Sequence, residues 1–212
     1  MPTRLCTENS AEEPTVTDTT AFVSDRAVIS DKNVVIGKNV VIEPNVVINE
    51  NVCIKDNVII HAGCVIGGKS FNFARSRKGE LVGWIDAGKT VIGENVEICP
   101  LAHIAQGCLE DDVTLLKDNC RIDSFVHIGH SARIGERAMI SAGAVIGGNS
   151  VIGDDAWVGI NATVSNRITV GNNARVSLGS VVTRNVGDSE TVTGNFAVPH
   201  ERFIEILKNN LN

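Results

Sequence analysis

Aliphatic residues recur every six positions along most of the chain. The first run comprises Ile36, Ile42, Ile48, Ile54, Ile60 and Ile66. After an interruption, the interval returns at Ile92, Ile98, Ile104, Leu116, Ile122, Ile128, Ile134, Ile140, Ile146, Ile152, Val158, Val164, Val170, Val176 and Val182. Glu110 alone breaks the pattern, so the register is least certain over residues 109–115. An interval of six fits neither an α-helix nor a simple succession of hairpins.

A solenoid of short strands and tight turns accounts for this interval. Three hexapeptides form one triangular coil, in which the aliphatic residue points inward and a small or β-branched residue precedes the next strand. Successive coils stack at the strand spacing of about 4.8 Å. Such arrays bury continuous aliphatic ladders and expose their turns. We therefore expect an all-β parallel β-helix domain over residues 23–198.

Three segments lie outside the repeat. Residues 1–22 are polar and predict a loose leader or a small cap. Residues 68–91 interrupt the array, and an insertion in a solenoid forms a loop on one face, often the binding face. Residues 199–212 combine apolar and charged positions as a short amphipathic α-helix does, with Pro199 tolerated at its start. We expect this helix to cover the open end of the solenoid.

Composition agrees with this fold and excludes several functions. Valine and isoleucine make up roughly a quarter of the chain, whereas aromatic residues are 4% and tyrosine is absent, as a narrow β-branched core requires. The net charge of −6 argues against nucleic acid as the main partner. There is no apolar run of the roughly 20 residues that a membrane span needs and no secretory signal, so we expect a cytoplasmic protein.

The six cysteines lack metal-binding spacing and are expected to be buried thiols without disulfides.

The repeat resembles that of the left-handed β-helix (hexapeptide-repeat) acyltransferases over nearly everything after residue 22. Ser-Phe-Asn-Phe-Ala at 70–74 and Ile-Asp-Ser-Phe-Val-His-Ile-Gly-His-Ser at 122–131 resemble the bacterial UDP-3-O-acylglucosamine N-acyltransferases of lipid A synthesis. The resemblance implies a left-handed helix and a homotrimer with active sites in clefts between subunits. It also implies that His130 is the general base and that the Gly148 N–H is the oxyanion donor.

The chain departs from that family at several positions. Residues 1–22 are too few for the uridine-binding domain that the family carries, Arg167 stands where a second histidine contacts substrate, and Ser124 stands where an asparagine usually follows the aspartate. Residues 157–164 and 178–186 resemble equally the acetyl-CoA-dependent enzymes that acetylate nucleotide-linked amino sugars for surface polysaccharides. The acyl acceptor is therefore expected to be an amino sugar, either of lipid A synthesis or of surface polysaccharide synthesis.

Acyl transfer needs a base, an oxyanion donor and a thioester held in line. Histidine suits the first role because its pKa lies near neutrality. At 18 residues per coil, His130 should lie between Asp112 below and Gly148 above, with Asn166 one coil further on as a candidate substrate contact. Either Asp112 or Asp123 could orient the imidazole, as a carboxylate does in a catalytic triad. A glycine N–H can approach an oxyanion closely.

Other histidines and the aromatic residues of the insertion are further candidates for substrate or subunit contacts. His127 could contact substrate or pack at a trimer contact, whereas His61 and His103 are expected to be structural or surface residues. Phe71 and Phe73 on the insertion could stack on a base or shield an acyl chain, or they could anchor the loop to a neighbouring subunit.

Three late arginines are candidates for contacting the acyl donor. Arg167, Arg175 and Arg184 could meet a CoA pyrophosphate, although solvated turn arginines are equally expected. The donor is expected to be acyl-CoA or acyl carrier protein, with CoA favoured, and no cofactor is expected to be bound permanently.

The sequence thus predicts an N-acyltransferase that acts on a nucleotide-linked amino sugar. An O-acetyltransferase acting on a sugar hydroxyl would use the same base. A γ-class carbonic anhydrase would need three histidines on zinc, but His127 and His130 are three residues apart instead of the five found in that class, so no metal is expected. A non-catalytic solenoid scaffold is the remaining alternative.

Overall fold

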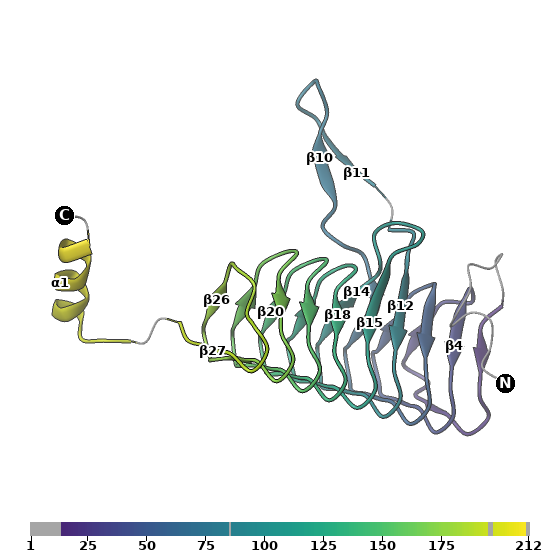
Figure 1. The fold of residues 1–212 in the computed structure, drawn as a ribbon. Helices are drawn as coiled ribbons and strands as arrows, with labels where there is room; N and C mark the ends of the chain where they lie inside the picture. The colour runs from purple at the N-terminus through teal and green to yellow at the C-terminus, as the bar shows by residue number, and fades with distance from the viewer. Residues whose placement is uncertain (1–13, 85, 195–196, 211–212) are drawn as a thin grey trace.

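The computed structural model describes residues 14–84, 86–194 and 197–210. It is a left-handed parallel β-helix followed by a short C-terminal helix, as the repeat and the resemblance predict (Figure 1). Each coil contributes one short strand to each of three parallel sheets.

Sheet one contains β1 (Val16–Thr17), β4 (Val34–Ile36), β7 (Val52–Ile54), β12 (Lys89–Ile92), β15 (Val113–Leu116), β18 (Arg133–Ile134), β21 (Val151–Ile152) and β24 (Thr169–Val170). Sheet two contains β2 (Phe22–Val23), β5 (Val41–Ile42), β8 (Ile59–Ile60), β13 (Glu97–Ile98), β16 (Arg121–Ile122), β19 (Met139–Ile140), β22 (Trp157–Val158), β25 (Arg175–Val176) and β27 (Thr191–Val192). Sheet three contains β3 (Val28–Ile29), β6 (Val47–Ile48), β9 (Val65–Gly68), β14 (His103–Ala105), β17 (His127–Ile128), β20 (Val145–Ile146), β23 (Thr163–Val164) and β26 (Val181–Val182).

The recurring aliphatic residues form the core because the strands pair in register. In sheet two, Ile98 pairs with Ile122, Ile122 with Ile140, and Ile140 with Val158, and all four are buried. The space at the corners is filled by small residues four positions after each aliphatic; in the second half of the array many of these are alanines, such as Ala132, Ala138, Ala144, Ala156 and Ala162. A core this narrow leaves no room for aromatic rings.

Asparagines occupy the corner positions of the early coils where the backbone is left-handed. Asn33, Asn39 and Asn45 have φ values of 52°, 53° and 63°, in the left-handed region that asparagine tolerates better than other non-glycine residues. The carboxamide of Asn33 donates to that of Asn51 at 3.0 Å, and a similar bond joins Asn39 to Asn57. These ladders link neighbouring coils at the surface.

Two coils are longer than 18 residues. Ile54 pairs with Ile92 across the predicted insertion, which occupies residues 69–88 because Lys89 already belongs to β12. Ile92 pairs with Leu116, 24 positions along, so six further residues bulge out near Glu110, where the pattern fails. The array also begins earlier than predicted: β1 lies within residues 1–22 and β2 begins at Phe22, and they pair with β4 and β5. Residues 1–13 lie outside the described part.

The insertion folds as an antiparallel hairpin of β10 (Phe73–Arg75) and β11 (Leu81–Gly83) that projects from the body (Figure 1). Helix α1 (His200–Asn210) stands apart from the last coil, so it does not cover the open end as expected (Figure 1). The residues that the structure describes between β27 and α1 run in extended form away from the array.

The prediction that the cysteines are buried thiols without disulfides is only partly confirmed. Cys64, Cys99, Cys108 and Cys120 are free thiols, and Cys64 and Cys120 are buried. Cys53, in contrast, is disulfide-bonded, which corrects the expectation that the chain has no disulfide. Cys6 lies outside the described residues.

Candidate functional site

The candidate base lies on the corner between sheet three and sheet one. His130 follows β17, and the Asn149 N–H of the next coil donates to its carbonyl oxygen at 2.8 Å. Gly148 lies directly above the ring: a Cβ added to it would come within 2.5 Å of the His130 Nε2. The absence of a side chain at position 148 therefore leaves space for the imidazole, which confirms the predicted stacking of these two residues.

Asp112 reaches His130 through a serine. Because the coil below His130 carries the extra six residues, Asp112 does not lie directly under the imidazole, contrary to the spacing argument. The Ser131 hydroxyl donates to Asp112 Oδ2 at 3.0 Å, and His130 Nδ1 lies 3.4 Å from the same Oγ. If Nδ1 carries the proton, it donates to Ser131 and leaves the lone pair on Nε2, the nitrogen next to Gly148. The Asn149 carboxamide, 3.5 Å from Nδ1, is the alternative neighbour.

The predicted oxyanion donor already has an acceptor. The Gly148 N–H donates to Asn166 Oδ1 at 3.0 Å, one coil further along the array. Similar contacts occur at the corner between sheets one and two, where the Glu136 N–H donates to Asp154 Oδ1 and the Asp154 N–H donates to Asn172 Oδ1. Asn166 is therefore next to Gly148, as predicted, but it occupies the N–H that an oxyanion would need.

Two further histidines form a stack beside His130. The rings of His103 and His127 lie 5.1 Å apart and nearly parallel on adjacent strands of sheet three. Burial lowers the pKa of His103, and burial together with the charges of His103 and His130 lowers the pKa of His127. Both rings are therefore neutral at pH 7. Gly68 makes room below them, because a Cβ there would lie 2.2 Å from His103 Nε2.

Asp123 is not part of this arrangement. It lies on a different corner, between sheets two and three, at the opposite end of strand β17. Its carboxylate accepts the Ser124 N–H at 2.7 Å and the Ala142 N–H at 3.0 Å, so it holds the corner turn. Within this chain, Asp123 therefore does not orient His130.

The three candidate arginines lie in two different places on the solenoid. Arg167 and Arg184 are exposed on the His130 corner, one and two coils beyond Gly148, and the Arg167 N–H donates to the Gly148 carbonyl at 3.0 Å. Arg175 lies on sheet two, where its guanidinium packs 4.0 Å from the ring centroid of Trp157. Within this chain, Arg167 and Arg184 share the corner of His130, whereas Arg175 does not.

The hairpin is fixed at its root beside the six-residue bulge. Asp86, which is buried, accepts the Ser70 N–H and the Asn72 carboxamide, both at 2.6 Å. The same carboxamide lies 3.3 Å from Cys108 Sγ, and the Cys108 N–H donates to Ser131 Oγ. A continuous chain of contacts therefore joins the hairpin root to the residue that flanks His130.

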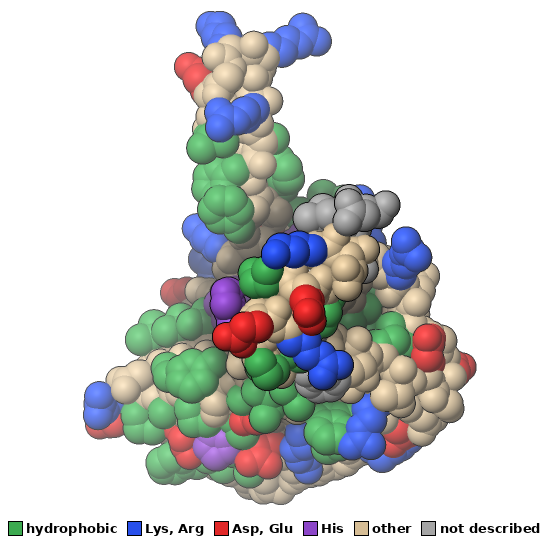
Figure 2. All heavy atoms as spheres, turned by 90° about the vertical axis from the view of Figure 1, so that its left-hand side faces the viewer, with side chains coloured by type: hydrophobic (Ala, Val, Ile, Leu, Met, Phe, Trp, Pro, Cys, Tyr) green, Lys and Arg blue, Asp and Glu red, His purple; other side chains and the backbone are tan. Residues whose placement is uncertain are grey.

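The predicted aromatic residues stand on this hairpin and remain exposed. Phe71 is 92% exposed and Phe73 is 52% exposed, and their ring centroids lie 5.0 Å apart. Figure 2 shows the hairpin standing out from the body, with apolar side chains along its stem and Lys and Arg side chains at its tip. The pair touches neither His130 nor Gly148 by any contact between described residues, so its substrate role stays a prediction.

Ser131 and Asp86 were missed by sequence reasoning. Ser131 directly follows His130, but the 18-residue interval hides its link to Asp112 because the intervening coil is longer. Asp86 gave no signal inside an aperiodic insertion, where the three-dimensional course of the hairpin decides its partners.

Comparisons with known proteins support the repeat family. The family model described as bacterial transferase hexapeptide (six repeats) matches residues 33–68 and 114–148. UDP-3-O-acylglucosamine N-acyltransferases from Dechloromonas aromatica and Hydrogenovibrio crunogenus are 42% and 44% identical over 76 and 69 residues. These stretches cover 34% and 32% of this chain but only 20% and 19% of the relatives, so the chain spans about a fifth of their length.

Solved structures match over a larger share of the chain. The UDP-N-acetylglucosamine acyltransferase of Francisella novicida is 27% identical, covers 90% of this chain and 73% of its own, and has a TM-score of 0.64. The enzyme of the same name from Campylobacter jejuni is 21% identical over 85% of this chain and 72% of its own, with a TM-score of 0.62, and supports the fold alone. The resemblance to hexapeptide-repeat acyltransferases is thereby confirmed. No helix among the described residues is long and apolar enough to cross a membrane.

Proposed function

We propose that this chain is an N-acyltransferase that moves an acyl group from acyl-CoA or acyl carrier protein to the amino group of a nucleotide-linked amino sugar. The product would serve bacterial surface polysaccharide or lipid A-type biosynthesis. The observation that carries the proposal is the position of the His130 Nε2 against Gly148, with Nδ1 directed at Ser131. This geometry places a basic nitrogen next to Gly148, whose backbone N–H is the oxyanion donor in the proposed reaction.

In this reaction the sugar amine attacks the thioester carbonyl, and the His130 Nε2 takes the proton that the nitrogen loses. The C–N bond forms while the carbonyl oxygen becomes an oxyanion. The tetrahedral intermediate then collapses, the C–S bond breaks, and the departing thiolate takes the proton from the imidazolium. The products are an amide and a free thiol, and the base returns to its neutral form.

Asp112 and Ser131 act as positioning residues in this mechanism. The Asp112 carboxylate fixes the Ser131 hydroxyl, whose oxygen then accepts the Nδ1 proton of His130. A hydrogen bond at Nδ1 sets the tautomer and favours the imidazolium that forms during the attack, as in the aspartate–histidine pair of a catalytic triad.

The Gly148 N–H becomes available to the oxyanion when the Asn166 carboxamide turns away. The N–H now donates to a neutral side-chain oxygen at 3.0 Å. A negatively charged oxygen is a stronger acceptor than an amide oxygen, so the exchange is favourable in the transition state. Asn166 then remains free to contact substrate.

Two surface features support our proposals for the acyl donor and for the oligomeric state. Exposed Arg167 and Arg184 suit the phosphate groups of CoA. A row of exposed apolar residues along the corner between sheets two and three supports contact between subunits, because a solvated corner gains nothing from such side chains. The row consists of Leu101, Phe125, Ile160 and Leu178. The assembly that we propose is a homotrimer, located in the cytoplasm.

Acyl transfer to a sugar hydroxyl is the second candidate. The Francisella novicida relative aligns with 90% of this chain, and its named acceptor, UDP-N-acetylglucosamine, has an amine that is already acylated. An acceptor of that type would offer a hydroxyl, and His130 would remove its proton in the same way. The product would then be an ester.

The test measures thiol release from acetyl-CoA, hydroxyacyl-CoA and hydroxyacyl carrier protein with a panel of nucleotide-linked sugars. Mass spectrometry and mild alkaline treatment distinguish an alkali-resistant amide from a labile ester. We expect an amide product and a decrease in kcat of about 10²–10⁴-fold for His130→Ala, the range typical of a lost general base. The matched control is His200→Ala, at an exposed position in α1. Thiol release that is unchanged in His130→Ala, or absent with every pair, would contradict the proposal.

A further inference from the structure

A second group of chemically active side chains lies on the corner between sheets two and three, away from His130. Glu43, His61 and Cys99 directly follow strands β5, β8 and β13, so they occupy equivalent positions on three successive coils. Glu97 comes from β13 itself. The stacking of coils thus brings a carboxylate, an imidazole, a thiol and a second carboxylate together from residues up to 56 positions apart.

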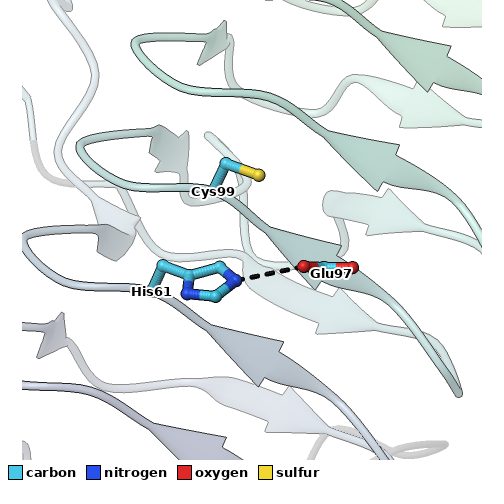
Figure 3. Close-up of side chains that lie close together, drawn as sticks. All are labelled: His61, Glu97 and Cys99. Atoms are coloured by element: carbon cyan, nitrogen blue, oxygen red, sulfur yellow. Dashed lines mark hydrogen bonds and ion pairs between the residues drawn. The ribbon is translucent and has the colours of Figure 1, made fainter.

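The imidazole of His61 lies between the two carboxylates. His61 Nδ1 is 3.0 Å from Glu43 Oε1, and its Nε2 is 3.1 Å from Glu97 Oε1 (Figure 3). Cys99 Sγ completes the group: one ligand atom each from His61, Glu97 and Cys99 lies within 4.8 Å of the other two. All three side chains are half-buried, so an ion can reach them.

These atoms match the coordination preferences of zinc. Zn²⁺ binds imidazole nitrogen and carboxylate oxygen at about 2.0–2.2 Å and thiolate sulfur at about 2.3 Å. Two such N and O ligands on a tetrahedral ion are about 3.3 Å apart, close to the Nε2–Oε1 separation of 3.1 Å. The sulfur lies within 4.8 Å of a ligand atom on both His61 and Glu97, so a small adjustment of the Cys99 side chain brings it to its place on the same ion. We propose that His61, Glu97 and Cys99 form a binding site for a zinc ion, with the fourth position open.

Glu43 holds the histidine in the orientation that this site needs. Its Oε1 accepts the Nδ1 proton of His61, and its Oε2 accepts the Ala62 N–H at 3.0 Å, so the carboxylate is fixed at both oxygens. A carboxylate behind a ligating histidine directs the other ring nitrogen at the metal and raises its basicity. Glu43 therefore makes His61 a preformed ligand, unlike an isolated surface histidine.

The neighbouring arginine leaves the required oxygen of Glu97 in place. Arg121 Nε approaches Oε2 of Glu97 at 3.7 Å, whereas Oε1 faces His61. The Arg121 guanidinium is itself bound by the carbonyls of Asn95, Asn119 and Cys120. Glu97 can thus use one oxygen for the ion and the other for the ion pair.

A hollow adjoins two of the three proposed ligands. Glu97 and Cys99 also line a hollow of about 350 Å³ on the outer face of sheet two, whose other walls include Asp123, Met139 and Trp157. A water molecule or a small anionic ligand in this hollow can complete the tetrahedron. The site therefore has an entry path as well as three ligands.

Binding is coupled to proton release. Burial, followed by the charges of Asp123 and Glu97, raises the pKa of the Cys99 thiol, so the thiol is protonated at neutral pH in the metal-free protein. The ion takes the thiolate and the Nε2 lone pair, and it replaces the hydrogen bond between His61 and Glu97. The protons of Sγ and Nε2 leave to solvent.

Cobalt(II) tests this site because it occupies tetrahedral zinc sites and reports a bound thiolate by a ligand-to-metal charge-transfer band. The full-length protein is treated with a chelator, freed of it, and titrated with Co²⁺ and then with Zn²⁺ as competitor. We expect one Co²⁺ per chain, with the charge-transfer band and the intense visible absorption of a tetrahedral ion, both abolished by stoichiometric Zn²⁺.

Substitutions show which residues bind the cobalt ion. Cys99→Ser should abolish the charge-transfer band, and His61→Gln should weaken Co²⁺ binding at least tenfold. Glu43→Gln should weaken it about 10–100-fold, because that is the usual effect of losing the carboxylate behind a metal-bound histidine. The matched control is Cys108→Ser, which removes another half-buried free thiol and should change nothing.

Three results would overturn the proposal: no stoichiometric Co²⁺ binding, a charge-transfer band that persists in Cys99→Ser, or a band that disappears in Cys108→Ser. The outcome is independent of acyl transfer, since His130→Ala should bind Co²⁺ as the unmodified chain does. Circular dichroism of each variant shows that a lost signal does not come from a lost fold.

Discussion

Gly148 and His130 form a pair in which the missing side chain of one makes room for the ring of the other. A methyl group at position 148 would lie 2.5 Å from Nε2, 2.8 Å from Cδ2 and 2.9 Å from Cε1 of His130. The nearest atoms to the added methyl all belong to this imidazole, which can rotate away, so the fold can survive the substitution while the base is displaced.

Gly148→Ala should therefore separate catalysis from stability. We expect kcat to fall by about 10²-fold, since a displacement of about 1 Å at a reacting group has that cost. The thermal midpoint should remain within a few degrees. The control is Gly187→Ala, where the added Cβ meets only Glu190 Oε2 at an ordinary 3.4 Å. Equal kcat values for the two variants would show that His130 is not the base.

The contact between Ser131 and Asp112 should affect the rate of turnover through His130. Ser131→Ala removes the acceptor for the Nδ1 proton and should lower kcat about tenfold with little change in KM. Ser131→Thr, which keeps the hydroxyl, should restore most of the rate.

Asp112→Asn should have no additional effect in the Ser131→Ala background. The two residues act on His130 through one chain of hydrogen bonds, so their effects should be strongly non-additive in a double-mutant cycle. Fully additive losses would indicate that Asp112 acts by another route, such as its bond to the Leu109 N–H.

Asn166→Ala should distinguish a structural from a substrate-binding role. The variant loses the bond to the Gly148 N–H, which should reduce the free energy of unfolding by about 1 kcal/mol. If Asn166 only occupies the N–H in the resting protein, kcat should stay the same or rise, because the oxyanion no longer competes with the carboxamide. A tenfold fall in kcat/KM would instead identify Asn166 as a substrate contact. Denaturant titration and steady-state kinetics on the same preparation provide both readouts.

The stacked histidines predict a loss of stability on mild acidification. The folded-state pKa values of His103 and His127 are lowered, mainly by burial, whereas the unfolded value is about 6.5. The unfolded state thus binds protons first, so the stabilisation is complete above pH 6.5 and decreases as the pH falls towards the folded-state values. The effect of His61 on stability has the opposite sign. Burial opposes its charged form, but its hydrogen bonds to Glu97 and Glu43 outweigh burial and raise its pKa, so protonation of His61 favours the folded state.

A difference measurement isolates the contribution of the stack. The free energy of unfolding is measured between pH 7.5 and 5.5 for the unmodified chain and for His127→Gln, in buffer without metal ions. We expect the decrease towards pH 5.5 to be smaller in the variant, with the contribution of His61 common to both curves. Parallel curves would mean that His127 does not carry the lowered pKa.

The fold was predictable because one local rule repeats along the chain. An inward aliphatic such as Ile122 needs another aliphatic one coil above and below, and the register provides Ile98 and Ile140. The handedness came from the resemblance to a known family, since the repeat interval itself is the same for either hand. The position of α1 was not predictable, because the apolar pattern of a helix does not identify its partner.

The site was predictable only where the 18-residue interval holds. It places Gly148 above His130 correctly because no insertion separates the two coils. It fails for Asp112, since six extra residues enter the coil below, and the carboxylate then reaches the imidazole only through Ser131. His61, Glu97 and Cys99 were not recognised as a group because the hairpin insertion separates them in sequence while the stacking of β8 and β13 joins them in space.

The aromatic pair on the hairpin should contribute to binding of the acyl donor or of the sugar nucleotide. Phe71 is 92% exposed and contacts only Phe73 among the described rings, so covering it with a ligand removes a large apolar surface from water. Phe71→Ala should raise the KM of one substrate about tenfold while leaving kcat unchanged, and the substrate affected identifies which one the hairpin contacts. The control is Leu81→Ala on the neighbouring strand, an apolar side chain that is 64% exposed but outside the aromatic pair. An unchanged KM for both substrates, together with a shift of the oligomer towards monomer on dilution, would assign Phe71 to subunit contact instead.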